Sequence, residues 1–271
     1  MSRGRISLPA PVRRPRGYSA PAMDHARSAD AARREDGAPP LIVAHRGAWH
    51  EAPQNSLEAV RHAAVLGCDA IEIDVRRTAD GRLVVVHDAR IGWRQVRRMD
   101  HRQVQDRLRV GQAPLLADVL DQAAGRLLVD VELKEDGYVE EAMAVVTARL
   151  PPDQYVVTSF LPRVLATVKA HQPATRTGLL LGPRSARQIA RRLRESGAGF
   201  LAPHVSLTHA GILRWAAQRD LACWVWTVND PRTLRALSAH PSVAALITDA
   251  PAAAITAAVS SHPVDLADSR E

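Results

Sequence analysis

Short apolar runs alternate with amphipathic stretches along the chain from residue 41 onward. The runs are rich in Val, Ile and Leu and are bounded by turn residues, which is typical of buried β-strands. Nine strands are predicted, at residues 41–44, 70–75, 83–87, 127–133, 155–158, 177–181, 200–202, 223–227 and 245–247.

Helix-start signals lie between most of these runs. Asn55 or Ser56 precedes a helical pattern that begins at Leu57, and Asp230-Pro231 precedes another. Repeated strand and helix units whose strands are apolar on both faces indicate a parallel sheet covered by helices. A doubly wound sheet and a closed barrel both satisfy this rule, and the number of strands favours an α/β fold of the (β/α)8 TIM barrel type.

The run at 83–87 is an exception to the alternation. Too few residues separate it from the run at 70–75 for a crossover helix, so it is predicted to extend that strand or to pair with it as a hairpin. Eight parallel strands then remain. The length of 271 residues suits one such barrel, which typically takes about 250, and residues 39–260 are assigned to it.

Composition refines this picture at the two ends of the chain. The hydrophobic fraction of 46% can build a sizeable core, and only 4% is aromatic, so Ala, Val, Leu and Ile must fill most of it. Residues 1–38 hold eight Arg against four acidic residues and lack apolar periodicity. They are predicted to be a disordered tail, and residues 261–271 a flexible C-terminal tail.

The net charge of +7 could suggest an anionic partner, and the basic tail could make weak contact with an anionic surface. No secretory signal is recognisable, and no stretch reaches the roughly 18 apolar residues that span a bilayer. The expected location is therefore cytoplasmic. Cys68 and Cys223 lie among apolar residues and are predicted to be buried, reduced thiols.

Polar side chains gather at the ends of the first predicted strands, where a barrel places its functional residues. They are His45 and Arg46, then Glu72 and Asp74, then His87, and finally Glu132 followed by Lys134. Because strand side chains alternate, Glu72 and Asp74 share one face, as do Glu132 and Lys134. Both pairs can point into the barrel mouth.

The three carboxylates Glu72, Asp74 and Glu132 predict a divalent-cation site. Hard oxygen ligands suit Mg²⁺ or Ca²⁺ better than Zn²⁺, and three carboxylates at the ends of apolar strands would be costly to bury without a cation. With Arg46 and Lys134 nearby, the mouth suits an anionic phosphate ester. His45 and His87 can transfer protons near neutral pH, and Gly47 allows a sharp turn.

The chain resembles the glycerophosphodiester phosphodiesterase family over about residues 41 to 255. The resemblance rests on Ala44-His45-Arg46-Gly47, Pro53-Gln54-Asn55-Ser56, Ala70-Ile71-Glu72-Ile73-Asp74-Val75, Thr78-Ala79-Asp80-Gly81, Val86-His87-Asp88, Val131-Glu132-Leu133-Lys134, Thr158-Ser159-Phe160, Trp224-Val225-Trp226-Thr227-Val228-Asn229 and Ile247-Thr248-Asp249-Ala250-Pro251.

That resemblance implies a phosphodiesterase-type barrel and a hydrolase of glycerol and lipid metabolism that cleaves glycerophosphodiesters to glycerol 3-phosphate and an alcohol. It implies the following roles: His45 and His87 as the acid/base pair, Glu72, Asp74 and Glu132 as ligands of one Mg²⁺ or Ca²⁺, Arg46 and Lys134 as phosphate ligands, and Phe160 and Trp226 as the wall of the substrate site, with Trp226 on the seventh strand of the barrel.

The chain departs from the family pattern in two places. Gln54 stands where the family usually has Glu, and Ser56 replaces Thr. The insertion after the second strand, residues 89–113, is short and is followed by Pro114-Leu115-Leu116. A short insertion is expected to leave the mouth more open, and it leaves the alcohol leaving group undetermined.

Two rival functions remain at this point. A lysophospholipase D or sphingomyelinase D type of barrel shares the His and carboxylate set, and an exposed apolar patch near the mouth would favour it. A non-catalytic binder of phosphate or nucleic acid could use the basic tail, although no expected catalytic His or ligand is replaced. The expected partner is a small phosphodiester rather than a specific nucleic acid, and nothing indicates an oligomeric state.

Overall fold

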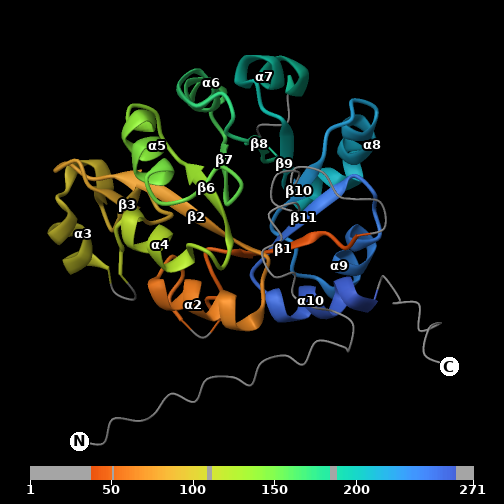
Figure 1. Ribbon diagram of the computed structural model, residues 1–271, viewed down its shortest axis with the longest axis horizontal. Coiled ribbons are helices and arrows are strands. Elements are labelled where there is room, and N and C mark those ends of the chain that lie inside the picture. Colours follow the sequence, from red (N-terminus) through yellow and green to blue (C-terminus); the bar gives the residue numbers. More distant parts are fainter. Residues whose placement is uncertain (1–37, 51, 109–111, 184–187, 261–271) are drawn as a thin grey trace, which may run out of the picture.

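The computed structural model describes residues 38–50, 52–108, 112–183 and 188–260. In this part of the chain, eight parallel strands pair side by side into a closed sheet, because β1 (Leu41–His45) pairs with both β11 (Val243–Thr248) and β2 (Ala70–Arg77). Helices surround the sheet (Figure 1). The predicted TIM barrel is confirmed. The expected tails, apart from Ala38, lie outside the described residues.

The remaining barrel strands and the helices that cover them follow in chain order. The strands are β6 (Leu128–Leu133), β7 (Tyr155–Ser159), β8 (Thr177–Leu181), β9 (Phe200–Pro203) and β10 (Cys223–Val225). The helices are α2 (Leu57–Leu66), α4 (Leu116–Ala123), α5 (Val139–Thr147), α6 (Pro162–His171), α7 (Ile189–Ser196), α8 (Ile212–Ala217), α9 (Pro231–Ser238) and α10 (Pro251–Ser260), with a 3-10 helix η2 (Val205–Ala210) before α8.

Two of the helix starts follow the predicted signals. The Ser56 hydroxyl accepts a hydrogen bond from the backbone N–H of Ala59 and caps α2. Asp230 caps α9 in the same way, with Pro231 in the first turn. No helix among the described residues has the length and hydrophobicity needed to cross a membrane.

Strand β3 (Leu83–Val85) pairs antiparallel with β2, in register Val75 to Val85, which confirms the predicted hairpin. It is shorter than predicted. The N–H of Val86 still donates to the carbonyl of Asp74 at 2.8 Å, but beyond it the carbonyl of His87 accepts from the Arg76 side chain instead of a strand. The sequence pattern does not reveal this change of partner.

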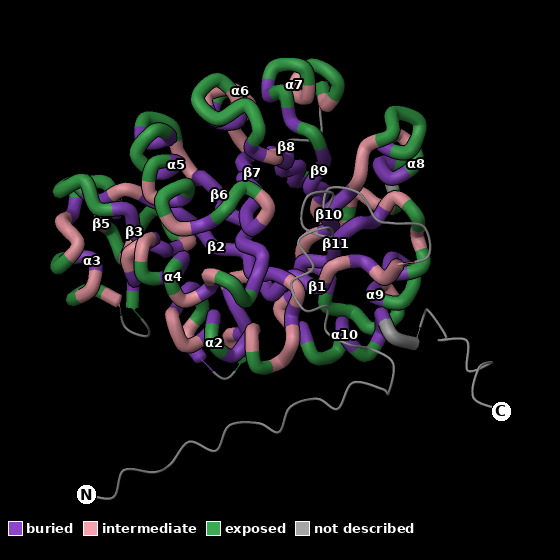
Figure 2. Tube along the Cα trace, viewed as in Figure 1, coloured by how far each residue is buried: buried purple, intermediate pink, exposed green. Residues whose placement is uncertain are grey.

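Apolar side chains form a layer between barrel and helices and a second cluster inside the barrel. Figure 2 shows the strands buried and the outward faces of the helices exposed. Phe200 and Trp224 fill the interior with ring centroids 5.0 Å apart. Gly178 makes this possible, because a Cβ there would lie 2.2 Å from the Phe200 ring. Cys68 and Cys223 are buried, as predicted, and no disulfide joins them.

The insertion after β3 forms a small unit beside the barrel. It contains the hairpin β4 (Arg90–Ile91) and β5 (Arg94–Gln95), a 3-10 helix η1 (Val96–Arg98), and α3 (His101–Arg107). In Figure 1 it extends from the barrel on the side of α4. Its apolar core consists of Val84, Val86, Val96, Met99, Val104 and Ala113. The insertion is therefore a packed extension of the β2–β3 hairpin.

Candidate active site

A cavity of about 210 Å³ opens where the barrel strands end at their C-terminal side. Most of the predicted site residues line it: His45, Arg46, Glu72, His87, Glu132, Lys134, Phe160 and Trp226. Asp74 is fully buried and does not line the cavity, but its carboxylate contacts Lys134 and Arg46, which do. The structure thus brings together all the residues that the sequence placed at strand ends.

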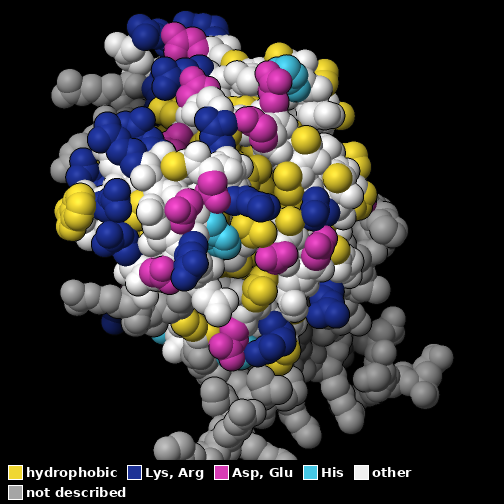
Figure 3. All heavy atoms as spheres, turned by 90° about the vertical axis from the view of Figure 1, so that its left-hand side faces the viewer, with side chains coloured by type: hydrophobic (Ala, Val, Ile, Leu, Met, Phe, Trp, Pro, Cys, Tyr) yellow, Lys and Arg dark blue, Asp and Glu magenta, His cyan; other side chains and the backbone are white. Residues whose placement is uncertain are grey.

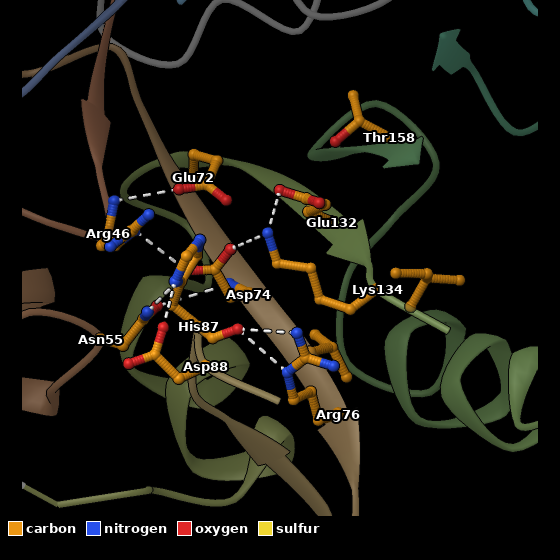
Figure 4. Close-up of polar contacts among 12 residues, drawn as sticks. Arg46, Asn55, Glu72, Asp74, Arg76, His87, Asp88, Glu132, Lys134 and Thr158 are labelled. Atoms are coloured by element: carbon orange, nitrogen blue, oxygen red, sulfur yellow. Dashed lines mark hydrogen bonds and ion pairs between the residues drawn. The ribbon is translucent and has the colours of Figure 1, made fainter. Parts of the chain in front are cut away.

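The three predicted ligands come from two adjacent strands. Glu72 and Asp74 stand two residues apart on β2, and Glu132 on β6 is the register partner of Asp74. One carboxylate oxygen of each lies within 4.8 Å of the others, as a metal site requires. Figure 4 shows these side chains converging from β2 and β6.

Lys134 lies directly against this cluster. Its Nζ is 2.6 Å from an oxygen of Asp74 and 2.6 Å from an oxygen of Glu132. Although burial alone would raise the pKa of Asp74, Lys134 and Arg46 outweigh it and hold that pKa at about 2. Burial would lower the pKa of Lys134, but Glu132 and Asp74 keep it above its usual value. Both groups are therefore charged at neutral pH.

Glu72 and Glu132 each keep one carboxylate oxygen free for a further ligand. Among the described residues, neither Glu72 Oε1 nor Glu132 Oε1 has a hydrogen-bond partner, although both are buried. Burial raises the pKa of Glu132 to about 7, and burial together with Asp74 raises the pKa of Glu72 well above its usual value. Two unpartnered oxygens on a convergent carboxylate set fit a hard divalent cation, which would stabilise the ionised forms.

His45 is held by a carboxylate that the sequence reasoning did not assign. Its Nδ1 lies 2.7 Å from Asp249 Oδ1, and Asp249 also accepts hydrogen bonds from the Trp49 indole at 3.2 Å and the Asn229 amide at 2.7 Å. Burial opposes ionisation of Asp249, but these hydrogen bonds lower its pKa to about 2. Because an ionised carboxylate only accepts, His45 Nδ1 must donate. His45 Nε2, 3.8 Å from Glu72, then faces the cavity.

Arg46 turns the chain directly after β1. It has a positive φ of 59°, and its backbone N–H donates to Glu72 Oε2 at 3.1 Å. Its guanidinium lies 3.1 Å from Asp74 Oδ2 and donates to Gln54 Oε1 at 2.7 Å. Gly47 follows at a φ of 81°, where a Cβ would lie 2.7 Å from Ala59, so the expected need for glycine is met.

Gln54, where the chain departs from the family pattern, and its neighbour Asn55 both contact residues of the site. The Asn55 amide donates to Asp74 Oδ2 at 2.8 Å, which leaves the helix cap to Ser56. Gln54 holds Arg46 through a neutral amide oxygen. The uncharged residue at 54 therefore orients the arginine without neutralising it.

His87 is anchored through its backbone as well as its ring. Its Nδ1 lies 2.8 Å from Asp88 Oδ1. Its carbonyl accepts two hydrogen bonds from Arg76, at 3.0 Å from Nε and 2.8 Å from Nη2 (Figure 4). The third nitrogen of Arg76 pairs with Glu135, beside Lys134 in the chain. Burial lowers the pKa of the His87 imidazole, which favours its neutral form.

Phe160 and Trp226 form an apolar wall on the cavity with Leu180 and Ile247. The Phe160 and Trp226 rings meet edge to face with centroids 5.6 Å apart, and the Trp226 indole donates to the Ala202 carbonyl at 2.7 Å. Strand β10 ends at Val225, two residues before the predicted end at 227, because its pairing with β11 stops there. Trp226 still forms a parallel β-bridge with His204, and its backbone N–H donates to the carbonyl of Pro203 at 3.1 Å.

Asp130 is a fourth carboxylate in the mouth, and the sequence reasoning passed over it. It is the register partner of Glu72, lines the cavity and accepts a hydrogen bond from the Thr158 hydroxyl at 2.7 Å. Its other oxygen is buried and accepts no hydrogen bond from the residues that the structure describes. Burial raises its pKa to about 8. Asp130 lies two residues before Glu132, so strand alternation alone could have placed it there.

The comparisons with known proteins agree with this geometry. The model of the "Glycerophosphoryl diester phosphodiesterase family" matches residues 45–253. A "Glycerophosphodiester phosphodiesterase" of Caldanaerobacter subterraneus is 27% identical over 160 residues, 52% of this chain and 66% of that protein. "Glycerophosphodiester phosphodiesterase 1" of Bos taurus is 26% identical over 161 residues, 52% of this chain and 49% of that protein. The matches thus span between about half and two thirds of these relatives.

Solved structures support the fold over about four fifths of this chain. A glycerophosphodiester phosphodiesterase from Parabacteroides distasonis superposes with a TM-score of 0.71 at 23% identity, covering 82% of this chain and 98% of that one. A phosphodiesterase from Oleispira antarctica, solved with sn-glycerol-3-phosphate, gives a TM-score of 0.70 at 22% identity, covering 81% and 96%. Since the family model matches most of the barrel, this chain belongs to the glycerophosphoryl diester phosphodiesterase family.

Proposed function

We propose that the protein hydrolyses glycerophosphodiesters to glycerol 3-phosphate and an alcohol, with one divalent cation, Mg²⁺ or Ca²⁺, held by Glu72, Asp74 and Glu132. The observation that carries the proposal is the convergence of these three carboxylates within 4.8 Å of one another, in a cavity also lined by two imidazoles and two cations. Membership of the family and the glycerol 3-phosphate bound to the Oleispira antarctica enzyme support it.

The bound cation would supply positive charge to the phosphate oxygens as negative charge grows on them. Arg46 and Lys134 would bind the same phosphate group. Each is already held against Asp74, at 3.1 Å and 2.6 Å, so little reorganisation is needed when the substrate arrives. Together they offset the single negative charge of the phosphodiester and the further charge that grows on its oxygens as the nucleophile adds.

The two imidazoles would move the protons. With Nδ1 donating to Asp249, neutral His45 presents the lone pair of Nε2 to the cavity. It can accept a proton there from the attacking hydroxyl group, that of a water molecule or of the substrate's glycerol, as that oxygen bonds to phosphorus. His87, which follows the β2 carboxylates in the sequence, can donate a proton to the leaving alcohol when its imidazole is protonated. Its backbone is fixed by Arg76, which limits the positions that its ring can take.

A lysophospholipid is the second candidate substrate. Phe160, Leu180, Trp226 and Ile247 give one side of the cavity an apolar surface that could contact the acyl chain, which a lysophospholipid carries on its glycerol. The reacting phosphodiester is the same, so the two candidates differ only in what occupies this wall.

The test is incubation of the purified protein with glycerophosphocholine, glycerophosphoethanolamine or lysophosphatidylcholine, with Mg²⁺, Ca²⁺ or a chelator. A coupled assay detects glycerol 3-phosphate, and choline is measured in parallel. We expect turnover of at least one glycerophosphodiester that stops on chelation and returns with the ion. Turnover that is unchanged by chelation would refute the ligand assignment.

Two variants separate the metal role from the acid/base role. Glu132→Gln is expected to raise the ion concentration needed for half-maximal rate, and His45→Ala to lower kcat by about a hundredfold or more. The matched controls are Glu140→Gln and His171→Ala, an exposed ion pair outside the cavity, which are expected to change neither value. Full activity of His45→Ala would refute its catalytic role.

A further inference from the structure

The insertion beside the barrel carries a concentrated positive charge. Residues 89–108 contain six Arg and two Asp, a net charge of +4 out of +7 for the whole chain. Five of these arginines are exposed and Arg94 is half-buried. Of the two acids, Asp106 lies 3.9 Å from Arg102 and offsets part of its charge, and Asp100 caps α3, so the net charge of the insertion stays positive.

An exposed tryptophan lies within this charged region. Trp93, at the turn of the β4–β5 hairpin, is 74% exposed. Val65, at 42%, is the other large hydrophobic side chain exposed in the described part of the chain. The guanidinium groups of Arg94 and Arg107 lie 5.4 Å and 5.7 Å from the Trp93 ring centroid. The hairpin and the end of α3 thus form one surface.

We name the basic insertion surface by its members: Trp93 with Arg90, Arg94, Arg97, Arg98, Arg102 and Arg107. Figure 3 shows Lys and Arg side chains gathered on this side of the molecule around a hydrophobic group that projects from its edge. The surface rests on its own apolar core, so its residues are presented by an ordered element.

The chemistry of this surface fits the headgroup region of a membrane. Indole rings partition to the interface between lipid and water, and arginines close to a bilayer are attracted to anionic lipids. Single-stranded nucleic acid is the competing anion. It is typically bound in a groove with several stacking aromatics, whereas here one indole projects from a hairpin turn. The observations therefore favour a lipid surface.

The basic insertion surface begins only a few residues after a residue that lines the cavity. Arg90 is three residues after His87, so their Cα atoms are separated by at most about 11 Å. We propose that the basic insertion surface docks the protein on anionic lipid bilayers, with Trp93 in the headgroup region and the barrel mouth held near the membrane. Docking is independent of the proposed hydrolysis and can be measured without it.

The experiment is cosedimentation of the full-length protein with vesicles of phosphatidylcholine containing 30% phosphatidylglycerol, and with vesicles of pure phosphatidylcholine. Binding is expected only to the anionic vesicles and is expected to weaken with salt. Trp93→Ala should weaken it about tenfold, and the double variant Arg97→Gln/Arg98→Gln about tenfold to thirtyfold. The basic N-terminal segment is unchanged in all these proteins.

Matched controls lie elsewhere on the barrel. Val65→Ala shortens the other large hydrophobic side chain that is exposed among the described residues. Arg232→Gln/Arg235→Gln removes the same charge from α9, on the opposite side of the barrel from α3 (Figure 1). Both should bind within twofold of the parent protein. Thermal unfolding and turnover of glycerophosphocholine should be unchanged in every variant.

Three results would overturn the proposal. One is absence of binding to anionic vesicles. Another is equal binding by the parent and by the Trp93 and Arg97/Arg98 variants, which would assign docking to another part of the chain. The third is tighter binding to a 20-nucleotide single strand that is lost in the same variants. If the parent binds vesicles but turns over neither glycerophosphocholine nor glycerophosphoethanolamine with either ion, the proposed function fails while docking stands.

Discussion

Replacing Asp130 by Asn removes a buried carboxyl group whose pKa is far from that of an exposed aspartate. Burial raises this pKa to about 8, so the folded protein takes up a proton that the unfolded chain does not hold above about pH 4. A raised carboxyl pKa gives full stability below the unfolded value, and that stability is lost as the pH rises toward the folded value. Asp130 should therefore destabilise the fold progressively between pH 4 and pH 8.

The Asn side chain is nearly the same size and keeps the acceptor for the Thr158 hydroxyl, at 2.7 Å in the parent. It does not titrate, so the free energy of unfolding of the variant should increase relative to that of the parent as pH rises. Each pH unit within the window contributes about 1.4 kcal/mol. Between pH 5.5 and pH 7.5 the difference between the two proteins should grow by up to about 3 kcal/mol.

The assay is urea unfolding of both proteins at the two pH values in the presence of a chelator, with linear extrapolation to water. Asp118→Asn, an exposed acid in the first turn of α4, is the control and should differ from the parent by the same amount at both pH values. A difference between Asp130→Asn and the parent that does not change with pH would refute the reasoning.

Three further predictions concern a positioning residue, metal binding and packing. Arg76→Gln should lower kcat about tenfold to a hundredfold with little change in KM, because His87 loses its backbone anchor; Arg76→Lys should restore part of it, and an unchanged kcat for Arg76→Gln would contradict this role. Because the pKa of Glu132 is about 7 without an ion, metal binding should release protons and should weaken as the pH falls below 7. Calorimetry in buffers of different ionisation enthalpy measures the number of protons released, and this number should be smaller for Glu132→Gln. Gly178→Ala should destabilise the protein by about 1–3 kcal/mol, since the new Cβ would overlap the Phe200 ring; denaturant unfolding equal to that of the parent would exclude this overlap.

Local sequence patterns predicted most of the fold. Alternating apolar runs and helix starts predicted the barrel, and the short spacing before residue 83 predicted the antiparallel β3. The sequence alone could not decide whether Asn55 or Ser56 caps the helix that begins at Leu57, because both residue types cap helices. Only the tertiary contact of Asn55 with Asp74 decides it.

The groups that support the imidazoles were harder to find. Asp249 contacts His45 across 204 positions of the chain, and no periodicity links two residues so far apart. Arg76 and Asp130 were closer to detection, because each lies two residues from a predicted ligand on the same strand. Alternation places them on the inner face, but whether such a residue binds substrate, supports a neighbour or only fills space depends on contacts that the sequence does not contain.

The most direct measurement is anomalous X-ray diffraction from crystals of the protein soaked in Mn²⁺, a hard cation that prefers the same oxygen ligands as Mg²⁺. A single strong peak is expected in the barrel mouth, about 2.0–2.6 Å from one oxygen each of Glu72, Asp74 and Glu132. It should disappear in crystals of Glu132→Gln soaked at low Mn²⁺ concentration. A mouth without a peak in crystals of the parent protein, or a peak away from these three carboxylates, would contradict the proposed centre.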